Sequence, residues 1–473
     1  MSPLPRACII GAGSSGIAAC KVFQERAIPF DCFEASDRIG GMWAYENSLG
    51  GTSAYRSLHI NTSKRQLVYS DFPIDSEAPD FPHHSQVIKY FNDYVDHFGF
   101  RDRIAFDRAV EGCERRDDGV WRVTLQGGEV RHYDALCVAN GHHWNPRCPD
   151  PAFAGSFDGE VLHSHHYRHP QDPVDCVGKT VVIVGMGNSA LDIACELGLK
   201  GNARQVYLSI RRGYYIVPKY IGSDTLDSFD PHPSEKPPFS YWLVPTWLKR
   251  RLRQRRLESV IGRPEDYGLP KPDYPLGATH PTISNEILIR IGSGDVIPKP
   301  NIEQLCGDSI RFVDGSSVPA EVLIYATGYR ITFPFLDPAF VAAPNNELPL
   351  FKRVVHPRHN NLFFIGLIQP LCATMPIAEL QSRWIAELLT GTYALPPKAE
   401  MERATNEFYE SMKARYLASP RHTIQIDCTE YSHDLRKEMR AGRQRAEILG
   451  NALTVPSQSG MAGIAGPAEA ATE

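Results

Sequence analysis

The pattern of apolar and polar positions predicts two units that begin in the same way. Residues 7–10 form a continuous apolar run, and residues 17–23 carry apolar side chains at helical spacing. The same order of apolar run and helical stretch returns at residues 180–184 and 191–199. Strands of parallel sheets are buried on both faces, so they occur as continuous apolar runs. The pattern therefore predicts an α/β protein with parallel sheets.

The remaining pattern places further elements around these two units. Apolar residues at helical spacing predict a helix over residues 87–98, and residues 104–140 predict a small antiparallel meander. Residues 213–282 contain many prolines and are the least regular part, whereas the tail 451–473 has the composition of a disordered segment. Further buried strands are predicted at 135–139, 322–326 and 362–365, and further helices at 377–389 and within 400–448.

The first apolar run leads into a glycine fingerprint of the form GxGxxG. A second strand follows the helix and ends on an acid 23 residues after the first glycine. In this context the glycines permit a tight turn and close approach to a pyrophosphate, and the acid accepts from a ribose. The helix N-terminus adds unpaired N–H groups for the phosphates. The residues predicted to bind this nucleotide are Gly11, Gly13, Ser14, Ser15, Gly16 and Glu34.

The second glycine turn has the same form, with alanine in the third glycine position. The strand that follows it ends on Arg211 and Arg212 and not on an acid. Two guanidinium groups would bind the 2′-phosphate that distinguishes NADPH from NADH. The second nucleotide is therefore predicted to be NADPH. The residues predicted to bind it are Gly185, Gly187, Asn188, Ser189, Ala190, Arg211 and Arg212.

Two further segments carry candidate site residues. Gly41, Met42 and Trp43 place glycine backbone beside a large aromatic side chain, which suggests contact with a flat ligand. Asn61 and Thr62 lie in a polar segment. Asparagine in such a segment is most often a turn residue. The residue pattern alone therefore does not decide whether Asn61 is a turn residue or part of a functional site.

Composition narrows the classes of function. The net charge of −5 over 473 residues does not indicate nucleic-acid binding. The eleven cysteines contain no CxxC pair, which predicts reduced thiols in a cytoplasmic protein, and neither a disulfide framework nor a zinc site. No run of about 18 apolar residues occurs, so no transmembrane helix is expected. The histidine-rich segment 157–167 lacks partners at ligand spacing, so it is interpreted as a linker and not as a metal site.

Residues 249–256 form a strongly basic stretch with a narrow apolar stripe. A membrane-surface helix is one interpretation of such a stretch. A solvated or subunit-contacting helix fits the narrow stripe better. The sequence thus predicts no membrane anchor here and leaves a homodimer open.

Several motifs together resemble those of the flavin-containing monooxygenases. The family pattern FxGxxxHxxxY ends here on Tyr167, whereas the similar Baeyer–Villiger enzymes usually end it on Trp. Tyr167 therefore favours the branch that oxidises heteroatoms. The resemblance is carried by residues 11–16, 40–43, 61–64, 70–73, 185–190, 326–329 and 419–427, and by Phe157, Gly159, His163 and Tyr167.

The resemblance implies two nested Rossmann-like dinucleotide-binding domains. The first part of the FAD-binding domain would span residues 1–168, and an inserted NADPH-binding domain would span 169–328. Residues 329–450 would complete the FAD-binding domain and add C-terminal helices.

The resemblance also implies a reaction on small molecules. NADPH reduces FAD, reduced flavin takes up O2 as a C4a-hydroperoxyflavin, and a soft N or S atom takes the distal oxygen. Asn61 resembles the active-site asparagine of the family, placed beside flavin and nicotinamide. Two alternatives stay open: a Baeyer–Villiger oxygenase of ketones, and a non-oxygenating NADPH oxidase or flavin-binding interaction protein.

Overall fold

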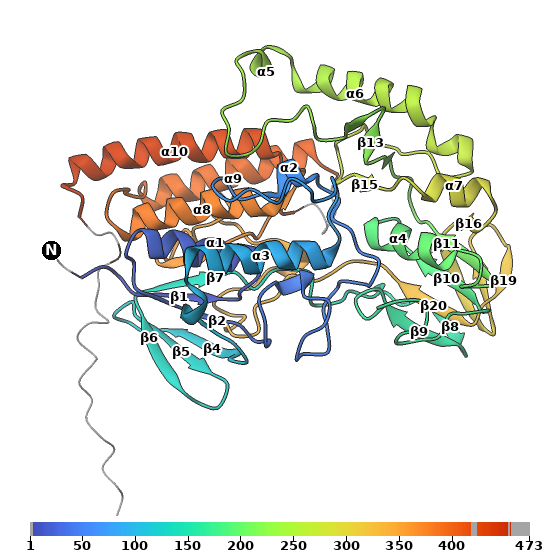
Figure 1. The fold of residues 1–473 in the computed structure, drawn as a ribbon, viewed down its shortest axis with the longest axis horizontal. Helices are drawn as coiled ribbons and strands as arrows, with labels where there is room; N and C mark the ends of the chain where they lie inside the picture. The colour runs from blue at the N-terminus through green and yellow to red at the C-terminus, as the bar shows by residue number, and fades with distance from the viewer. Residues whose placement is uncertain (1–2, 418–422, 453–454, 456–473) are drawn as a thin grey trace, which may run out of the picture.

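The computed structural model describes residues 3–417, 423–452 and 455. Most of the tail 451–473, which is predicted to be disordered, and residues 419–422 of the motif at 419–427 lie outside these described residues. Figure 1 shows two α/β units side by side. The chain leaves the first unit, builds the second and then returns, as the strand pairing below demonstrates.

A five-stranded parallel sheet forms the first unit, in the order β21 (Leu362–Phe364), β7 (Ala135–Val138), β1 (Ala7–Ile10), β2 (Phe30–Phe33) and β3 (Ile104–Ala105). Although β21 comes from late in the chain, it pairs with β7 in parallel, with Leu362 opposite Leu136. This pairing brings the chain back into the first sheet after the second unit. It confirms the predicted α/β fold of two nested Rossmann-like units.

The two faces of this sheet bury separate cores. One face packs against the helices α1 (Ser14–Glu25), α3 (His84–Phe98) and α8 (Thr374–Leu389). The other face packs against an antiparallel meander of β4 (Val110–Arg115), β5 (Trp121–Leu125) and β6 (Val130–Tyr133). Figure 1 shows the helices above the sheet and the meander below it. The predicted helix at 87–98 is thus confirmed, and so is a meander, which spans 110–133 within the predicted range 104–140.

A second five-stranded parallel sheet forms the inserted unit, in the order β16 (Val296–Lys299), β11 (Gln205–Ser209), β10 (Thr180–Val184), β20 (Val322–Tyr325) and β9 (Glu160–His163). Helices α4 (Asn188–Leu197) and α7 (Ile287–Gly292) share a core with one face. A small sheet of β19 (Ser317–Pro319), β18 (Ser309–Phe312), β17 (Ile302–Gly307) and β8 (Ala154–Phe157) packs on the other face.

Strand pairing extends the second unit toward the N-terminus. Strand β9 pairs with β20, and β8 pairs with β17, although both precede residue 168. The linker interpretation of residues 157–167 is therefore wrong, because His163 ends an edge strand of the sheet. Tyr167 follows this strand, is buried, and donates its hydroxyl to Glu196 Oε2 at 2.8 Å. Tyr167, the last residue of the motif FxGxxxHxxxY, thus connects the segment after β9 to α4.

The proline-rich insertion contains short strands and two helices. Strand β12 (Ile216–Val217) pairs with β15 (Thr282–Ile283), and β13 (Tyr220–Ile221) pairs with β14 (Asp224–Thr225). Helix α5 (Ser240–Leu243) precedes α6 (Thr246–Ile261), which contains the basic stretch and runs along the top edge in Figure 1. Among the helices of the described chain, none has the length and apolar character that crossing a bilayer requires.

Helices α9 (Lys398–Arg415) and α10 (Cys428–Ile448) follow α8, as the charged pattern predicts. Short strands β22 (Gln369–Pro370) and β23 (Gln425–Ile426) pair in parallel just before α8 and α10. Cys372 and Cys428, which follow these strands, form a disulfide. The prediction that all cysteines are reduced is therefore wrong for this pair. A tertiary contact across 56 residues brings the two thiols together, and no local spacing motif announces it.

Candidate functional site

The first glycine turn connects β1 to α1 and depends on the absence of side chains. Gly11 has φ +101°, and a Cβ added there would lie 2.7 Å from the carbonyl oxygen of Ala139. A Cβ on Gly16 would lie 1.8 Å from the carbonyl oxygen of Gly11. Both contacts are too close for any side chain, so these two glycines let the turn pack against the end of β7. Ser14 and Ser15 begin the helix, and Gly13 caps it without a side-chain hydrogen bond.

A second glycine segment faces this turn. Gly41, Met42 and Trp43 form the short 3₁₀ helix η1 (Gly41–Trp43), and Gly41 has φ +54°. A Cβ added to Gly13 would lie 3.5 Å from the Gly41 backbone, and no other residue would lie within 4 Å of it. The backbones of these two segments therefore lie against each other, and the space that a Gly13 side chain would need stays open. This arrangement fits a diphosphate held by N–H groups at the start of α1.

Glu34 ends β2 and is buried against the turn. Its Oε2 accepts from the Ala12 N–H at 2.7 Å, and its Oε1 accepts from the N–H and hydroxyl of Ser36 at 3.0 and 2.8 Å. An ionised carboxylate offers about four lone-pair sites. One of them remains for a ribose hydroxyl, so Glu34 both holds the glycine turn and can accept from the nucleotide predicted there.

The turn between β10 and α4 repeats this geometry. Gly185 has φ +138°, and a Cβ added there would lie 2.5 Å from the carbonyl oxygen of Ala326. Gly187 caps α4 without a side-chain hydrogen bond, and Ser189 follows in the first turn of the helix. Asn188 Oδ1 accepts from the N–H of Ile283 at 2.8 Å. The buried Ala190 takes the place of the third glycine.

Arg211 and Arg212 follow β11 but differ in their contacts. Arg212 makes two hydrogen bonds to the Asp273 carboxylate, at 2.6 and 2.8 Å, and lies over the ring of Tyr274. Arg211 is exposed, and its guanidinium makes no hydrogen bond or ion pair to any other described residue. Arg211 is thus the freer of the two to bind a 2′-phosphate, whereas Arg212 would have to share or leave its carboxylate.

Comparison with known proteins decides the family to which this pair of nucleotide turns belongs. Residues 5–464 match the model of the family described as Flavin-binding monooxygenase-like. The chain belongs to this family. It is therefore an enzyme, a flavin-dependent monooxygenase, and membership confirms the predicted FAD and NADPH cofactors.

Curated relatives align over most of the chain. Flavin-containing monooxygenase 5 of Rattus norvegicus is 37% identical over 452 residues, which cover 91% of this chain and 82% of that protein. Dimethylaniline monooxygenase (N-oxide-forming) 2 of Oryctolagus cuniculus is 31% identical over 456 residues, which cover 92% of this chain and 83% of that protein.

Solved structures of lower identity share the fold. S-allyl-L-cysteine S-oxygenase from Allium sativum has a TM-score of 0.67 at 24% identity, covering 94% of this chain and 92% of that one. OTEMO in complex with FAD and NADP has a TM-score of 0.70 at 20% identity, covering 94% of this chain and 99% of that one. At these identities the likeness shows the fold alone.

In this monooxygenase, the segment that carries Asn61 is held from the other unit. Asn61 is partly buried, and its amide makes no hydrogen bond to another residue of the described chain. Lys219, beside β13, donates from Nζ to the carbonyl oxygen of Ile60 at 3.2 Å and lies over the Phe81 ring at 5.0 Å. Burial lowers the pKa of the Lys219 ammonium. The backbone before Asn61 is therefore tied to the insertion of the second unit.

The backbone after Asn61 is tied to the same insertion. The N–H of Ser63 donates to Asp227 Oδ2 at 2.8 Å, and the Gln66 amide donates to the carbonyl oxygen of Asp230 at 2.7 Å. Thr62 lies between these anchors. We call residues 219–230 the clasp, because their contacts lie on both sides of Asn61. The clasp leaves the Asn61 amide available for a ligand while it fixes the backbone that carries it.

A buried pair also joins the two units. The Tyr55 hydroxyl of the first unit donates to the Asp192 carboxylate on α4. Burial raises the pKa of Asp192 to about 6, and burial also raises the pKa of Tyr55. Sequence reasoning missed Asp192, although its place four residues after Asn188 on one helix face is a signal that both point the same way.

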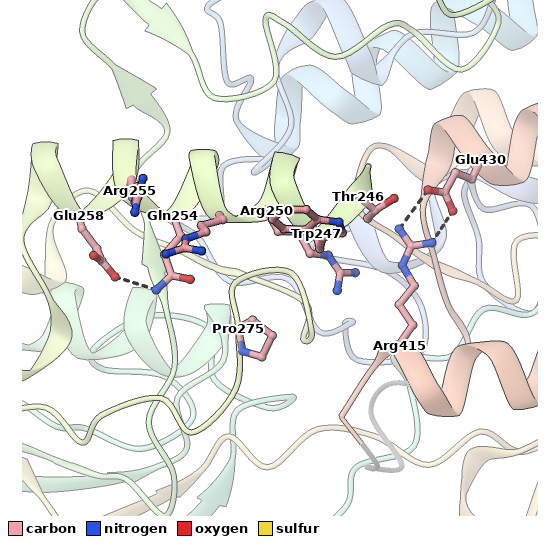
Figure 2. A pocket seen from close by; sticks show the side chains of 10 residues that line it. Thr246, Trp247, Arg250, Gln254, Arg255, Glu258, Pro275, Arg415 and Glu430 are labelled. Atoms are coloured by element: carbon pink, nitrogen blue, oxygen red, sulfur yellow. Dashed lines mark hydrogen bonds and ion pairs between the residues drawn. The ribbon is translucent and has the colours of Figure 1, made fainter. Parts of the chain in front are cut away.

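Sequence reasoning also missed Lys219 and Asp227, which lie in the irregular insertion where no periodic pattern marks a facing side chain. A pocket along α6 is a further feature that the motifs do not indicate (Figure 2). None of the residues predicted to bind a nucleotide lines it.

Proposed function

We propose that this monooxygenase oxygenates soft nucleophilic nitrogen or sulfur atoms of small molecules, with NADPH as electron donor and O2 as oxidant. The relative at 31% identity is named for forming N-oxides. Tyr167 ends the family motif where ketone oxygenases usually carry Trp. These observations support heteroatom oxygenation over Baeyer–Villiger chemistry.

We assign FAD to the first glycine turn and NADPH to the second. Gly11 to Gly16 and η1 would hold the FAD diphosphate, and Glu34 would accept from its ribose. The second turn and Arg211 would hold NADPH. Within this assignment the FAD-binding domain consists of residues 1–168 and 329–450, and the inserted domain of residues 169–328, with β8 and β9 pairing into the inserted domain's sheets.

The observation that carries the proposal is the free amide of Asn61, held between the two units by the clasp. Bound FAD supplies the oxygen chemistry once NADPH has reduced it. The amide can donate to one partner and accept from another at the same time. It carries no charge, so it adds no negative charge beside an oxygen atom that is about to be transferred. The clasp restricts the motion of this group and helps exclude water from the interface.

Asn61→Asp and Asn61→Ala test this role. Both variants should bind FAD and accept electrons from NADPH, but should form less oxygenated product per NADPH consumed and more hydrogen peroxide. The aspartate would be negatively charged near neutral pH and would repel developing negative charge. The assay measures thioether or tertiary-amine product, NADPH and peroxide together.

Asn92→Asp on α3 is the matched control, because it makes the same chemical change at an amide that bonds to Ile88 and Arg101. It should keep the product ratio of the unmodified enzyme. An unchanged ratio in Asn61→Asp would return Asn61 to the role of a turn residue. Efficient conversion of a cyclic ketone, with no thioether product, would instead favour the Baeyer–Villiger alternative.

A further inference from the structure

A pocket of about 710 Å³ lies along one face of α6 (Figure 2). Seven of the lining residues lie on α6 at spacings of three and four residues, so they share one face of this helix. Figure 2 shows Pro275 and Arg415 across from that face, with Arg415 reaching toward Glu430. The lining residues are Thr246, Trp247, Arg250, Arg251, Gln254, Arg255, Glu258, Pro275, Arg415 and Glu430. Four arginines therefore face only two glutamates.

The acidic residues of the lining are already engaged. Glu258 Oε1 accepts from the Gln254 amide at 2.8 Å, and Glu430 accepts from both terminal nitrogens of Arg415. By contrast, the guanidinium groups of Arg250, Arg251 and Arg255 make no hydrogen bond or ion pair elsewhere in the described chain. Among the described lining residues, arginines thus outnumber carboxylates, and neither glutamate is bonded to Arg250, Arg251 or Arg255.

Arg250 is held in place at the floor of this pocket. It is partly buried, and a Cβ added to Gly277 would lie 3.3 Å from Arg250 Nε, so the glycine makes room for the side chain. Burial lowers the pKa of Arg250, and the positive charge of Arg415 lowers it further. Holding an unpaired guanidinium in such surroundings costs free energy. An anion in the pocket would offset that cost.

Arg415 adds a donor to the opposite wall. Its terminal nitrogens contact Glu430, and Asp427 lies 3.5 Å from one of them, so this charge is largely neutralised. Its Nε is buried and has no hydrogen-bond partner among the described residues. A buried N–H without an acceptor is rare in folded proteins.

We infer that this pocket binds a small soluble molecule that carries a multiply charged phosphate group. Arginine forks match phosphate oxygens in pairs, and the three unpaired arginines on α6 supply several such forks. Trp247 is 64% exposed at the rim and can stack on a planar ring attached to the phosphate. The volume suits a ligand of nucleotide size. The pocket lies between α6 and the lining residues Pro275 and Arg415, which favours a small ligand over a flat membrane surface.

Calorimetric titration of the FAD-loaded full chain with ADP, and separately with inorganic pyrophosphate, tests this inference. We expect saturable binding that weakens as salt is raised, because exposed charge pairs are screened. Arg250→Gln should weaken both ligands by about tenfold or more, as expected for loss of a charge-assisted contact. Arg256→Gln on the same helix does not line the pocket and should change affinity by less than about threefold.

Two controls separate this site from the NADPH site and from folding. Flavin content and the thermal unfolding midpoint should be equal in Arg250→Gln and Arg256→Gln. The KM for NADPH should change in Arg211→Ala and stay unchanged in Arg250→Gln. Three results would overturn the inference: no binding of either phosphate, equal loss in both variants, or displacement of ADP by NADPH with loss in Arg211→Ala. Sedimentation with anionic vesicles that depends on Arg250, without binding of the soluble phosphates, would show a membrane surface instead.

Discussion

The choice between NADPH and NADH should depend on Arg211 far more than on its neighbour Arg212. The exposed Arg211 guanidinium has no partner among the described residues, whereas Arg212 is engaged twice by Asp273. We therefore expect Arg211→Ala to raise the KM for NADPH and leave the KM for NADH nearly unchanged. NADH lacks the 2′-phosphate, so it cannot lose that contact.

The magnitude follows from the kind of contact. A hydrogen bond to a charged group contributes about 1.5–3 kcal/mol. Since about 1.4 kcal/mol corresponds to a factor of ten, losing this contact should weaken NADPH by about 10- to 150-fold. The effect belongs to binding, so it should be largest at subsaturating NADPH. The flavin reduction rate at saturation should change much less.

Arg212→Ala is the matched control. It removes an ion pair in which the side chains are 36% and 62% exposed, and such exposed pairs contribute little. We expect a small change that is equal for NADPH and NADH. The assay is anaerobic flavin reduction over a range of each cofactor. A selective loss of NADPH in Arg212→Ala, or an equal loss of both cofactors in Arg211→Ala, would refute this assignment.

Three further predictions follow from the described contacts. Gly13→Ala should fold, because its Cβ would meet only the Gly41 backbone, but it should purify with little flavin, because that Cβ would enter the space proposed for the diphosphate. Gly16→Ala should not accumulate as folded protein, because its Cβ would overlap a carbonyl oxygen. Flavin content and circular dichroism measure the two effects, and full flavin content in Gly13→Ala would contradict the proposed site. Burial raises the pKa of Asp192 from 3.8 to about 6, so the stability that its protonated form contributes is present at low pH and lost as the pH rises through about 6. In urea unfolding, the free energy of unfolding of Asp192→Asn should therefore rise relative to that of the unmodified chain between pH 5 and 7.5. A difference that stays constant over this range would contradict the prediction. Cys372→Ser should lower the free energy of unfolding by about 2–4 kcal/mol. A reductant should lower the free energy of unfolding of the unmodified chain by a similar amount and leave that of the variant unchanged.

The local sequence pattern predicts those parts of this protein whose conformation depends on residues close together in the chain. The turn after β1 needs a positive φ at Gly11 and no Cβ at Gly16, and these needs appear directly as glycines. Buried parallel strands appear as apolar runs because both faces are covered. The parallel sheets, the meander and the α3 helix could thus be predicted, together with the two nucleotide turns.

Long-range pairing could not be predicted in this way, because the partner of a polar side chain is chosen by tertiary packing. Lys219 lies about 160 residues from Ile60 in the chain, yet it donates to that carbonyl oxygen across the two units. Arg211 and Arg212 are neighbours of the same type, but Asp273 engages only one of them. Periods of 2.0 and 3.6 residues show which face of an element is buried, and they carry no information about which distant loop will meet it. The sequence by itself therefore determined the two glycine turns at which we propose that the nucleotides bind. Only the tertiary structure decided that Lys219 and Asp227 anchor the backbone on either side of Asn61.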